Sequence, residues 1–201
     1  TIENATYGVE IDNKTGTSFY CDQNDFFNNY CGIHVANNTT FVADVIWGNE
    51  FHGSPVSFFP TTPALACIPM YGIKVDGPTG NVFSWQLIMN IGTYLGHGVP
   101  APNQFYSLYS TGIHMTQAKS RIRGCTFSNF HLFGGSGLSI AANGIGIRNI
   151  DSDIWVENDI TDPYPRITFH NLDYGIYTSV STGYTQTQVY GAKFTWCASW
   201  A

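Results

Sequence analysis

The sequence predicts an all-β protein built as a solenoid of parallel strands, a parallel β-helix. Two observations carry this prediction: short segments of alternating apolar and polar residues recur along the chain, and a Gly-aliphatic pair follows several of them. A pattern that returns every few tens of residues is typical of solenoids, in which each repeat packs on the next. No segment shows the 3.6-residue apolar periodicity of an amphipathic helix. We expect about six coils in a single domain spanning residues 1–201.

The clearest copy of the repeat is Phe26–Val35, in which Phe-x-Asn is followed, three residues later, by Gly-Ile-x-Val. The segments Ile2–Ile11 and Phe169–Thr178 have the same spacing. Alternation of period two indicates a short strand in each half of the motif. Asn and Gly are typical of the tight corners between such strands, because both tolerate positive φ. Related Gly-aliphatic pairs with longer spacing begin at Gly72, Gly112 and Gly137.

Apolar residues at equivalent positions are expected to stack inside the solenoid, about 4.8 Å apart along its axis. One predicted column consists of Phe26, Phe51, Ile88, Phe127, Phe169 and Phe194. A second consists of Ile33, Ile73, Ile113, Leu138 and Ile176. Stacked asparagines can also hydrogen-bond along such a column, as in cross-β assemblies.

Three coils are predicted to carry insertions, because some Gly-aliphatic pairs lie farther apart than Gly8 and Gly32. Two insertions, residues 54–71 and 91–111, follow the same corner and are expected to lie side by side. The third, residues 141–163, is ambiguous, since it contains a further Gly-Ile pair. Either it forms an extra coil, or residues 166–170 belong to a loop.

These repeats resemble the right-handed parallel β-helix superfamily, the pectate-lyase-like folds of secreted bacterial and phage proteins. The resemblance covers essentially the whole chain and implies a right-handed coil and an extracellular or cell-surface location. It is specific for the fold and not for the activity, since the fold hosts lyases, hydrolases, epimerases, adhesins and tailspikes. A β-sandwich is the competing fold, but its antiparallel strands do not explain the Phe-x-Asn and Gly-Ile register.

Composition and charge exclude several functional classes. Charged residues make up 11% of the chain and the formal net charge is −6, which disfavours nucleic acid as a partner. No apolar run approaches the roughly 18 residues of a transmembrane helix. The repeat is cut at both ends, which predicts a fragment of a longer solenoid. The expected partners are other coils or domains of the same larger protein, glycans, or further copies of the chain.

The five cysteines are widely spaced, without the CxxC pattern of zinc or redox sites. Cys21 and Cys125 occupy core-facing repeat positions, where the expectation is a small buried hydrophobe. Cys31 and Cys67 each lie near a turn that precedes a Gly-Ile strand, so a disulfide between them is conceivable, although the sequence does not fix the pairing.

Asp25, Glu50 and His52 are the candidate catalytic residues. The two carboxylates precede phenylalanines of successive coils and would lie about 5 Å apart, with His52 beside them. Such a pair could share a proton or hold a cation. The competing interpretation is a solvated polar row on the outer face. The Asn-Thr-Asp and Gly-His-Asp motifs that polygalacturonase-like relatives would imply do not occur.

The predicted insertions carry aromatic side chains that would suit a sugar ring or a protein partner. The candidate binding residues are Phe58, Phe59, Tyr94, Phe105, Tyr106 and Tyr109. An equally open interpretation is that these rings pack on one another and on the solenoid. On the outward face of the Gly-Ile strands, His34, Lys74 and His114 would form a weakly basic row, which is either surface decoration or a strip for an anionic glycan.

The densest acidic stretch offers a calcium site in a loop, with Asp151, Asp153 and Asp159 as candidate ligands. Their spacing is not that of the Asp-x-Asp-x-Asp-Gly loop, and no other cofactor is expected. The sequence as a whole favours a non-enzymatic, extracellular structural or adhesive segment. The alternative is a polysaccharide lyase or glycoside hydrolase.

Overall fold

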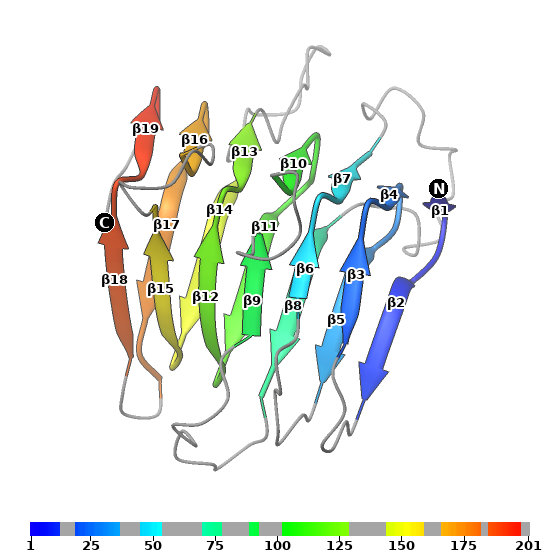
Figure 1. Ribbon diagram of the computed structural model, residues 1–201, viewed down its shortest axis with the longest axis horizontal. Coiled ribbons are helices and arrows are strands. Elements are labelled where there is room, and N and C mark those ends of the chain that lie inside the picture. Colours follow the sequence, from blue (N-terminus) through cyan, green and yellow to red (C-terminus); the bar gives the residue numbers. More distant parts are fainter. Residues whose placement is uncertain are drawn as a thin grey trace, which may run out of the picture.

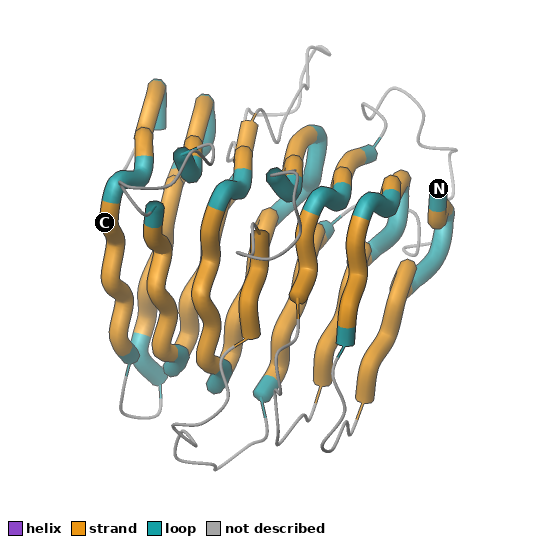
Figure 2. Tube along the Cα trace, viewed as in Figure 1, coloured by secondary structure: helices purple, strands orange, loops and turns teal. Residues whose placement is uncertain are grey.

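The computed structural model describes residues 1–12, 19–36, 45–53, 70–77, 89–92, 102–128, 144–158, 166–181 and 185–197. In these segments the regular structure consists of strands, which form three parallel sheets (Figures 1 and 2). The chain visits the sheets in turn, so that each strand pairs with its equivalents in the preceding and following coils. This all-β arrangement is compatible with the predicted β-helix solenoid. No helix in the described segments is long and apolar enough to cross a membrane.

The three sheets are named here by their content. The phenylalanine sheet consists of β1 (Ile2–Glu3), β4 (Asp25–Phe27), β7 (Glu50–His52), β10 (Gln104–Tyr106), β13 (Thr126–Ser128), β16 (Thr168–His170) and β19 (Lys193–Thr195). The glycine sheet consists of β2 (Tyr7–Asp12), β5 (Cys31–Ala36), β8 (Tyr71–Asp76), β11 (Thr111–Thr116), β14 (Ile145–Ile150) and β17 (Tyr174–Ser179). The third sheet consists of β3 (Tyr20–Asp22), β6 (Val45–Trp47), β9 (Met89–Gly92), β12 (Lys119–Arg123), β15 (Asp153–Glu157) and β18 (Gln186–Tyr190).

A column of stacked phenylalanines runs through the core. Neighbouring ring centroids are 4.7–4.9 Å apart and the ring planes lie within 9° of parallel. The column consists of Phe26, Phe51, Phe105, Phe127, Phe169 and Phe194. It confirms the predicted column at every position except one: Phe105 stands where Ile88 was expected, and Ile88 lies outside the described residues.

The predicted isoleucine column is also present, with one correction. Register along the glycine sheet places Val9, Ile33, Ile73, Ile113, Ile147 and Ile176 in one row. The prediction of Leu138 in this row was wrong, because β11 pairs directly with β14 and so aligns Ile113 with Ile147. The third sheet adds a column consisting of Cys21, Ile46, Ile91, Ile122, Val156 and Val189.

The insertions differ from the prediction, which treated strands of two regular coils as inserted loops. Residues 91–111 include the end of β9 and all of β10, so they are not one loop. Residues 141–163 contain β14 and β15, which are ordinary strands of a coil, and residues 168–170 form β16 and not a loop. Of the first insertion, residues 54–69 lie outside the described part of the chain, and Tyr71 begins β8.

The recurrence of Gly at the equivalent position of each coil has a steric cause. A Cβ atom on Gly32 would lie 2.5 Å from a ring carbon of Phe51 and 2.7 Å from the carbonyl oxygen of Gly72. Only glycine permits this approach of backbone to ring and backbone to backbone. Positive φ instead occurs at the asparagine corners, as expected, with φ of 56° at Asn4 and 53° at Asn28.

A ladder of buried amides lines the corner that precedes the phenylalanine sheet. Asn49 Oδ1 accepts hydrogen bonds from the backbone N–H of Asn24 at 3.0 Å and from its Nδ2 at 3.2 Å. Asn103 Oδ1 accepts the equivalent bonds from Asn49, at 2.9 Å and 3.3 Å. The expected stacking of asparagines therefore occurs, two residues before the phenylalanines Phe26, Phe51 and Phe105 rather than at the Phe-x-Asn corner.

Candidate functional site

The predicted catalytic residues lie together on the outward face of the phenylalanine sheet. Strand pairing aligns Asp25 with Glu50, and it aligns Phe27 with His52. Because side chains alternate along a strand, the inward phenylalanines of β4 and β7 turn these neighbours outward. The imidazole Nε2 of His52 lies 2.7 Å from Oδ1 of Asp25, and the hydroxyl of Thr1 donates to Oδ2 at 3.0 Å.

A second pair lies beside the first. The phenolic hydroxyl of Tyr106, on β10, donates to Oε2 of Glu50 at 3.0 Å, and Gln104 Nε2 reaches Oε1 at 3.5 Å. Both carboxylates of the predicted dyad therefore have partners on neighbouring strands. Tyr106 was predicted as a loop residue for ligand binding, and the sequence alignment that placed Ile88 in the core hid its position next to Glu50.

Protonation in this group follows from its contacts. Partial burial raises the pKa of the Asp25 carboxyl, but the hydrogen bonds from His52 and Thr1 outweigh that effect and leave the pKa below its ordinary value. Desolvation, together with the hydrogen bond to Glu50, raises the pKa of Tyr106 to about 12. At neutral pH, Asp25 is therefore ionised and Tyr106 keeps its proton.

The rings on this face stack on one another. His52 lies 4.8 Å from Tyr106 with ring planes 13° apart, and Phe27 lies 5.1 Å away on its other side, tilted by 48°. Each face of the imidazole is therefore covered by a neighbouring ring. A sugar approaching His52 would meet the edge of its ring and the carboxylates, and not an open aromatic face.

Of the remaining predicted binding aromatics, the structure describes Phe105 and Tyr109. Phe105 is fully buried in the phenylalanine column, so its placement on a surface loop was wrong. Tyr109 lies between β10 and β11 and is 49% exposed. Phe58, Phe59 and Tyr94 lie outside the described residues.

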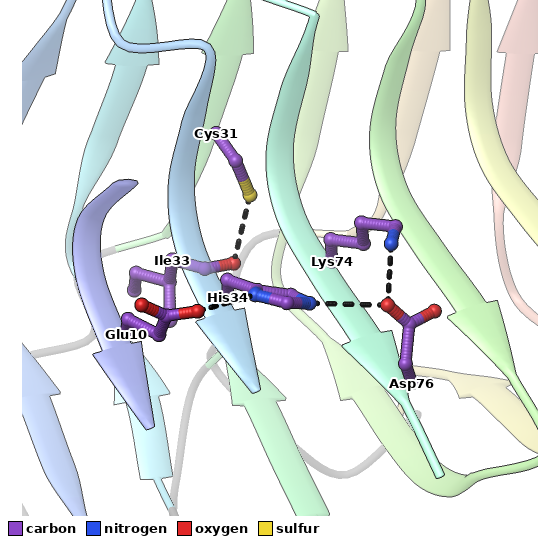
Figure 3. A network of polar contacts seen from close by, with 6 residues as sticks. All are labelled: Glu10, Cys31, Ile33, His34, Lys74 and Asp76. Atoms are coloured by element: carbon purple, nitrogen blue, oxygen red, sulfur yellow. Dashed lines mark hydrogen bonds and ion pairs between the residues drawn. The ribbon is translucent and has the colours of Figure 1, made fainter. Parts of the chain in front are cut away.

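A polar network crosses the outward face of the glycine sheet. His34 on β5 lies between two carboxylates: its Nδ1 is 3.3 Å from Oε1 of Glu10, and its Nε2 is 3.0 Å from Oδ2 of Asp76 (Figure 3). Lys74 forms an ion pair with the same Asp76 oxygen. The ring of Tyr7 stacks on His34 at 4.7 Å. The network ties together three successive strands, β2, β5 and β8.

The predicted basic row on this sheet continues further than expected. Register places Lys74, His114 and Arg148 on neighbouring strands, and Tyr177 follows Arg148. The sequence prediction missed Arg148, because it aligned Gly137-Leu138, and not Gly146-Ile147, with Gly112-Ile113. Burial, together with the charge of Arg148, lowers the pKa of His114 to about 4.

The predicted calcium ligands do not converge in the described part of the chain. Asp151 accepts hydrogen bonds from the backbone N–H and the hydroxyl of Ser181. Asp153 is buried and lies 3.7 Å from the ammonium of Lys119. Asp159 lies outside the described residues. Within the segments that are described, no group of three or more His, Cys, Asp or Glu side chains is arranged to hold a metal ion.

The cysteines that the structure describes are free thiols. Cys21 and Cys125 are buried in the core, as predicted. Cys31 is completely buried, its Sγ–H donates to the carbonyl of Ile33 at 3.2 Å, and burial raises the pKa of the thiol to about 12. Cys31 is thus a free thiol, and Cys67, its conceivable disulfide partner, lies outside the described residues.

Comparison of the chain with protein-family models, with curated proteins and with solved structures gives no match. The candidate site is accordingly defined by its own geometry: an Asp–His pair and a Tyr–Glu pair on three adjacent strands. The Asp25–His52 pair can orient an imidazole for proton transfer. The Tyr106–Glu50 pair can present a hydroxyl and a carboxylate to a ligand.

Proposed function

We propose that this protein is a right-handed parallel β-helix of the pectate-lyase-like kind that serves as an extracellular structural or adhesive module of a secreted or cell-surface protein. One observation carries the proposal: outward polar side chains on two of the sheets are paired with neighbours one coil away. Asp25 binds His52, Glu50 binds Tyr106, and His34 bridges Glu10 and Asp76. Cross-strand pairs of this kind stabilise a sheet surface.

The core supports the same proposal. Six stacked phenylalanines join each coil to the next, and the amide ladder joins three of these coils, so that the stability of the stack accumulates along its axis. A rigid rod with a polar and weakly charged surface suits a stalk or an adhesin. Contact with glycans or a partner protein would use exposed aromatic side chains such as Tyr109, together with Phe58, Phe59 and Tyr94.

A glycan array with a parallel turnover assay tests the proposal. The purified chain is probed on immobilised neutral and acidic glycans. It is also incubated with the corresponding polysaccharides while reducing ends and the ultraviolet absorbance of unsaturated products are measured. Binding without turnover is the expected result for an adhesive module. Turnover that disappears in Asp25→Asn or His52→Gln would contradict it.

The alternative function is that of a polysaccharide lyase or glycoside hydrolase. It is favoured by the proximity of the two pairs, which brings a carboxylate-oriented imidazole and a protonated tyrosine to adjacent strands. In that role His52 would act as a general base held by Asp25, and Tyr106 would donate a proton or a hydrogen bond to the leaving oxygen.

Stability measurements separate the two functions. A group placed for chemistry is often suboptimal for folding, so its removal is tolerated or stabilises the protein. If the pairs are structural, Asp25→Asn and Tyr106→Phe should each lower the free energy of unfolding and leave any glycan binding unchanged. If the pairs are catalytic, the same variants should fold as well as the wild type and lose turnover.

A further inference from the structure

Three basic side chains form a continuous row on the glycine sheet. Pairing of β8 with β11 aligns Lys74 with His114, and pairing of β11 with β14 aligns His114 with Arg148. Adjacent strands in a sheet are about 4.8 Å apart, so the row spans roughly 10 Å. The members of the row differ in how their polar atoms are satisfied.

Lys74 belongs to the network of Figure 3. Its ammonium is paired with Asp76, which also accepts from His34, and His34 in turn faces Glu10. The positive charge of Lys74 is thus balanced within the network. On the side of the row nearest β5, the basic groups are already paired with carboxylates and would bind an added anion only weakly.

Arg148 is different. No carboxylate in the described part of the chain pairs with it, and its closest described partner is the ring of Tyr177, 5.8 Å from the guanidinium carbon. Its Nε atom is buried and has no hydrogen-bond partner. The arginines of β12 differ in their ion pairing, since Arg121 and Arg123 both reach the carboxylate of Glu157, although the Nε atom of Arg121 is also buried without a hydrogen bond.

His114 lies between Lys74 and Arg148. The residue is 8% exposed, and its Nδ1 atom is buried without a hydrogen-bond partner. The edge of its ring meets the ring of Tyr71 at 5.5 Å, and the phenol of Tyr71 lies within electrostatic range of both Lys74 and Arg148. A buried polar atom left unpaired destabilises the folded state, so native structures rarely keep one without a reason.

We propose that His114 and Arg148, with Tyr71 beside them, form a binding site for a single oxyanion, a carboxylate or a sulfate group. An oxyanion would accept hydrogen bonds from the guanidinium, which suits planar or tetrahedral oxygens, and from an imidazole N–H. It would satisfy both buried nitrogens at once and balance the charge of Arg148. The oxyanion is either free in solution or carried by a sugar, and the site does not depend on an adhesive role for the protein.

Titration of the histidine signals by nuclear magnetic resonance tests the site. Sodium sulfate and sodium glucuronate are added at constant ionic strength, and the signal of His114 is assigned with the variant His114→Gln. Each probe should give a saturable shift at His114 and should raise the pKa of this residue from its low value towards the ordinary one. The signals of His52 and His170, on the phenylalanine sheet, should show no saturable shift with either probe.

Variants give the decisive comparison. Arg148→Gln should weaken binding by about tenfold or more, because it removes a charge-assisted hydrogen bond, while Arg148→Lys should retain part of the affinity. Lys193→Gln removes one positive charge from an exposed position on β19 and should bind as the wild type does. Circular dichroism verifies that each variant keeps its sheet content. The absence of a saturable shift with either probe, or an equal shift in Arg148→Gln, would overturn the proposal.

A sulfated disaccharide and its desulfated counterpart identify the source of the anion. Tighter binding of the sulfated sugar than of inorganic sulfate would assign the oxyanion to a carbohydrate, whereas equal affinity would assign it to a free ion. Equal binding of the sulfated and desulfated sugars at His114 would contradict an oxyanion site.

Discussion

The ring of Phe51 packs directly on the backbone of Gly32 in the preceding coil, leaving no room for a Cβ atom. The same contact recurs along the stack, with Phe105 on Gly72 and Phe127 on Gly112. It explains why glycine recurs at this position, because the ring of a phenylalanine in the next coil packs against the glycine backbone.

The first prediction concerns this contact. Gly32→Ala should lower the free energy of unfolding by about 1–3 kcal/mol, since the methyl group overpacks a close-packed core. Urea denaturation measures the change. A double-mutant cycle with Phe51→Leu serves as the control, because a smaller side chain at position 51 should relieve part of the clash. Strictly additive effects would contradict direct packing of the two residues.

The second prediction concerns the corrected register at Phe105. Phe105→Ala should cost about 3–5 kcal/mol, as expected for a buried phenylalanine, and the milder Phe105→Leu should cost less. Tyr190→Ala, at an exposed position on β18, should change stability by no more than about 0.5 kcal/mol. Thermal or chemical unfolding would show the difference. Similar small effects at both positions would mean that Phe105 belongs to a surface loop.

The third prediction concerns the amide ladder. Asn49→Ala removes the acceptor of two hydrogen bonds from Asn24 and the donor to the carbonyls of Cys21 and Trp47. The buried groups left unpaired should lower stability by about 1–3 kcal/mol. Asn90→Ala, on the outward side of β9, is the matched control and should be nearly neutral. Equal effects of the two variants in equilibrium unfolding would argue against the ladder.

The fourth prediction concerns pH. Burial raises the pKa of Asp76, but its hydrogen bonds with Lys74 and His34 outweigh burial and hold the pKa below its ordinary value of 3.8. A carboxyl with a depressed folded-state pKa contributes stability above its unfolded pKa and loses it as pH falls through the folded value. The stability difference between wild type and Asp76→Asn should therefore be largest at neutral pH and shrink below about pH 4. Urea midpoints across pH measure it; a pH-independent difference would contradict the prediction.

The fold was largely predictable because the repeat combines two constraints that few other sequences satisfy. Phe-x-Asn and Gly-Ile each show strand periodicity, and the recurrence of both Phe and Gly follows from the contact between ring and glycine in successive coils. The register was predicted wrongly where a segment resembled the repeat motif without being a copy of it. Ile88-x-Asn90 imitates the motif, and only the three-dimensional stack shows that Phe105 fills the aromatic column.

The candidate site was predictable only in part. Asp25, Glu50 and His52 follow from the repeat, since register places them on adjacent strands. Predicting the positions of Tyr106 and Arg148 requires the correct alignment of the fourth and fifth coils. An alignment shifted by one motif places neither residue beside its true neighbours. The sequence also contains no signal for side-chain pairing along the rows, because that depends on rotamers and on burial.

The amide ladder has a consequence for how the coils find their places. Asn24, Asn49 and Asn103 are followed in the same row by Cys125, Ile167 and Ala192, so the row changes from polar to apolar midway along the stack. If the chain slipped by one whole coil, an amide would face an apolar side chain and remain unsatisfied, at a cost of about 1–3 kcal/mol. The phenylalanine column alone would tolerate such a slip, since all its members are alike. The asparagines thus help to fix the register of the coils, which the repeated phenylalanines alone would leave open.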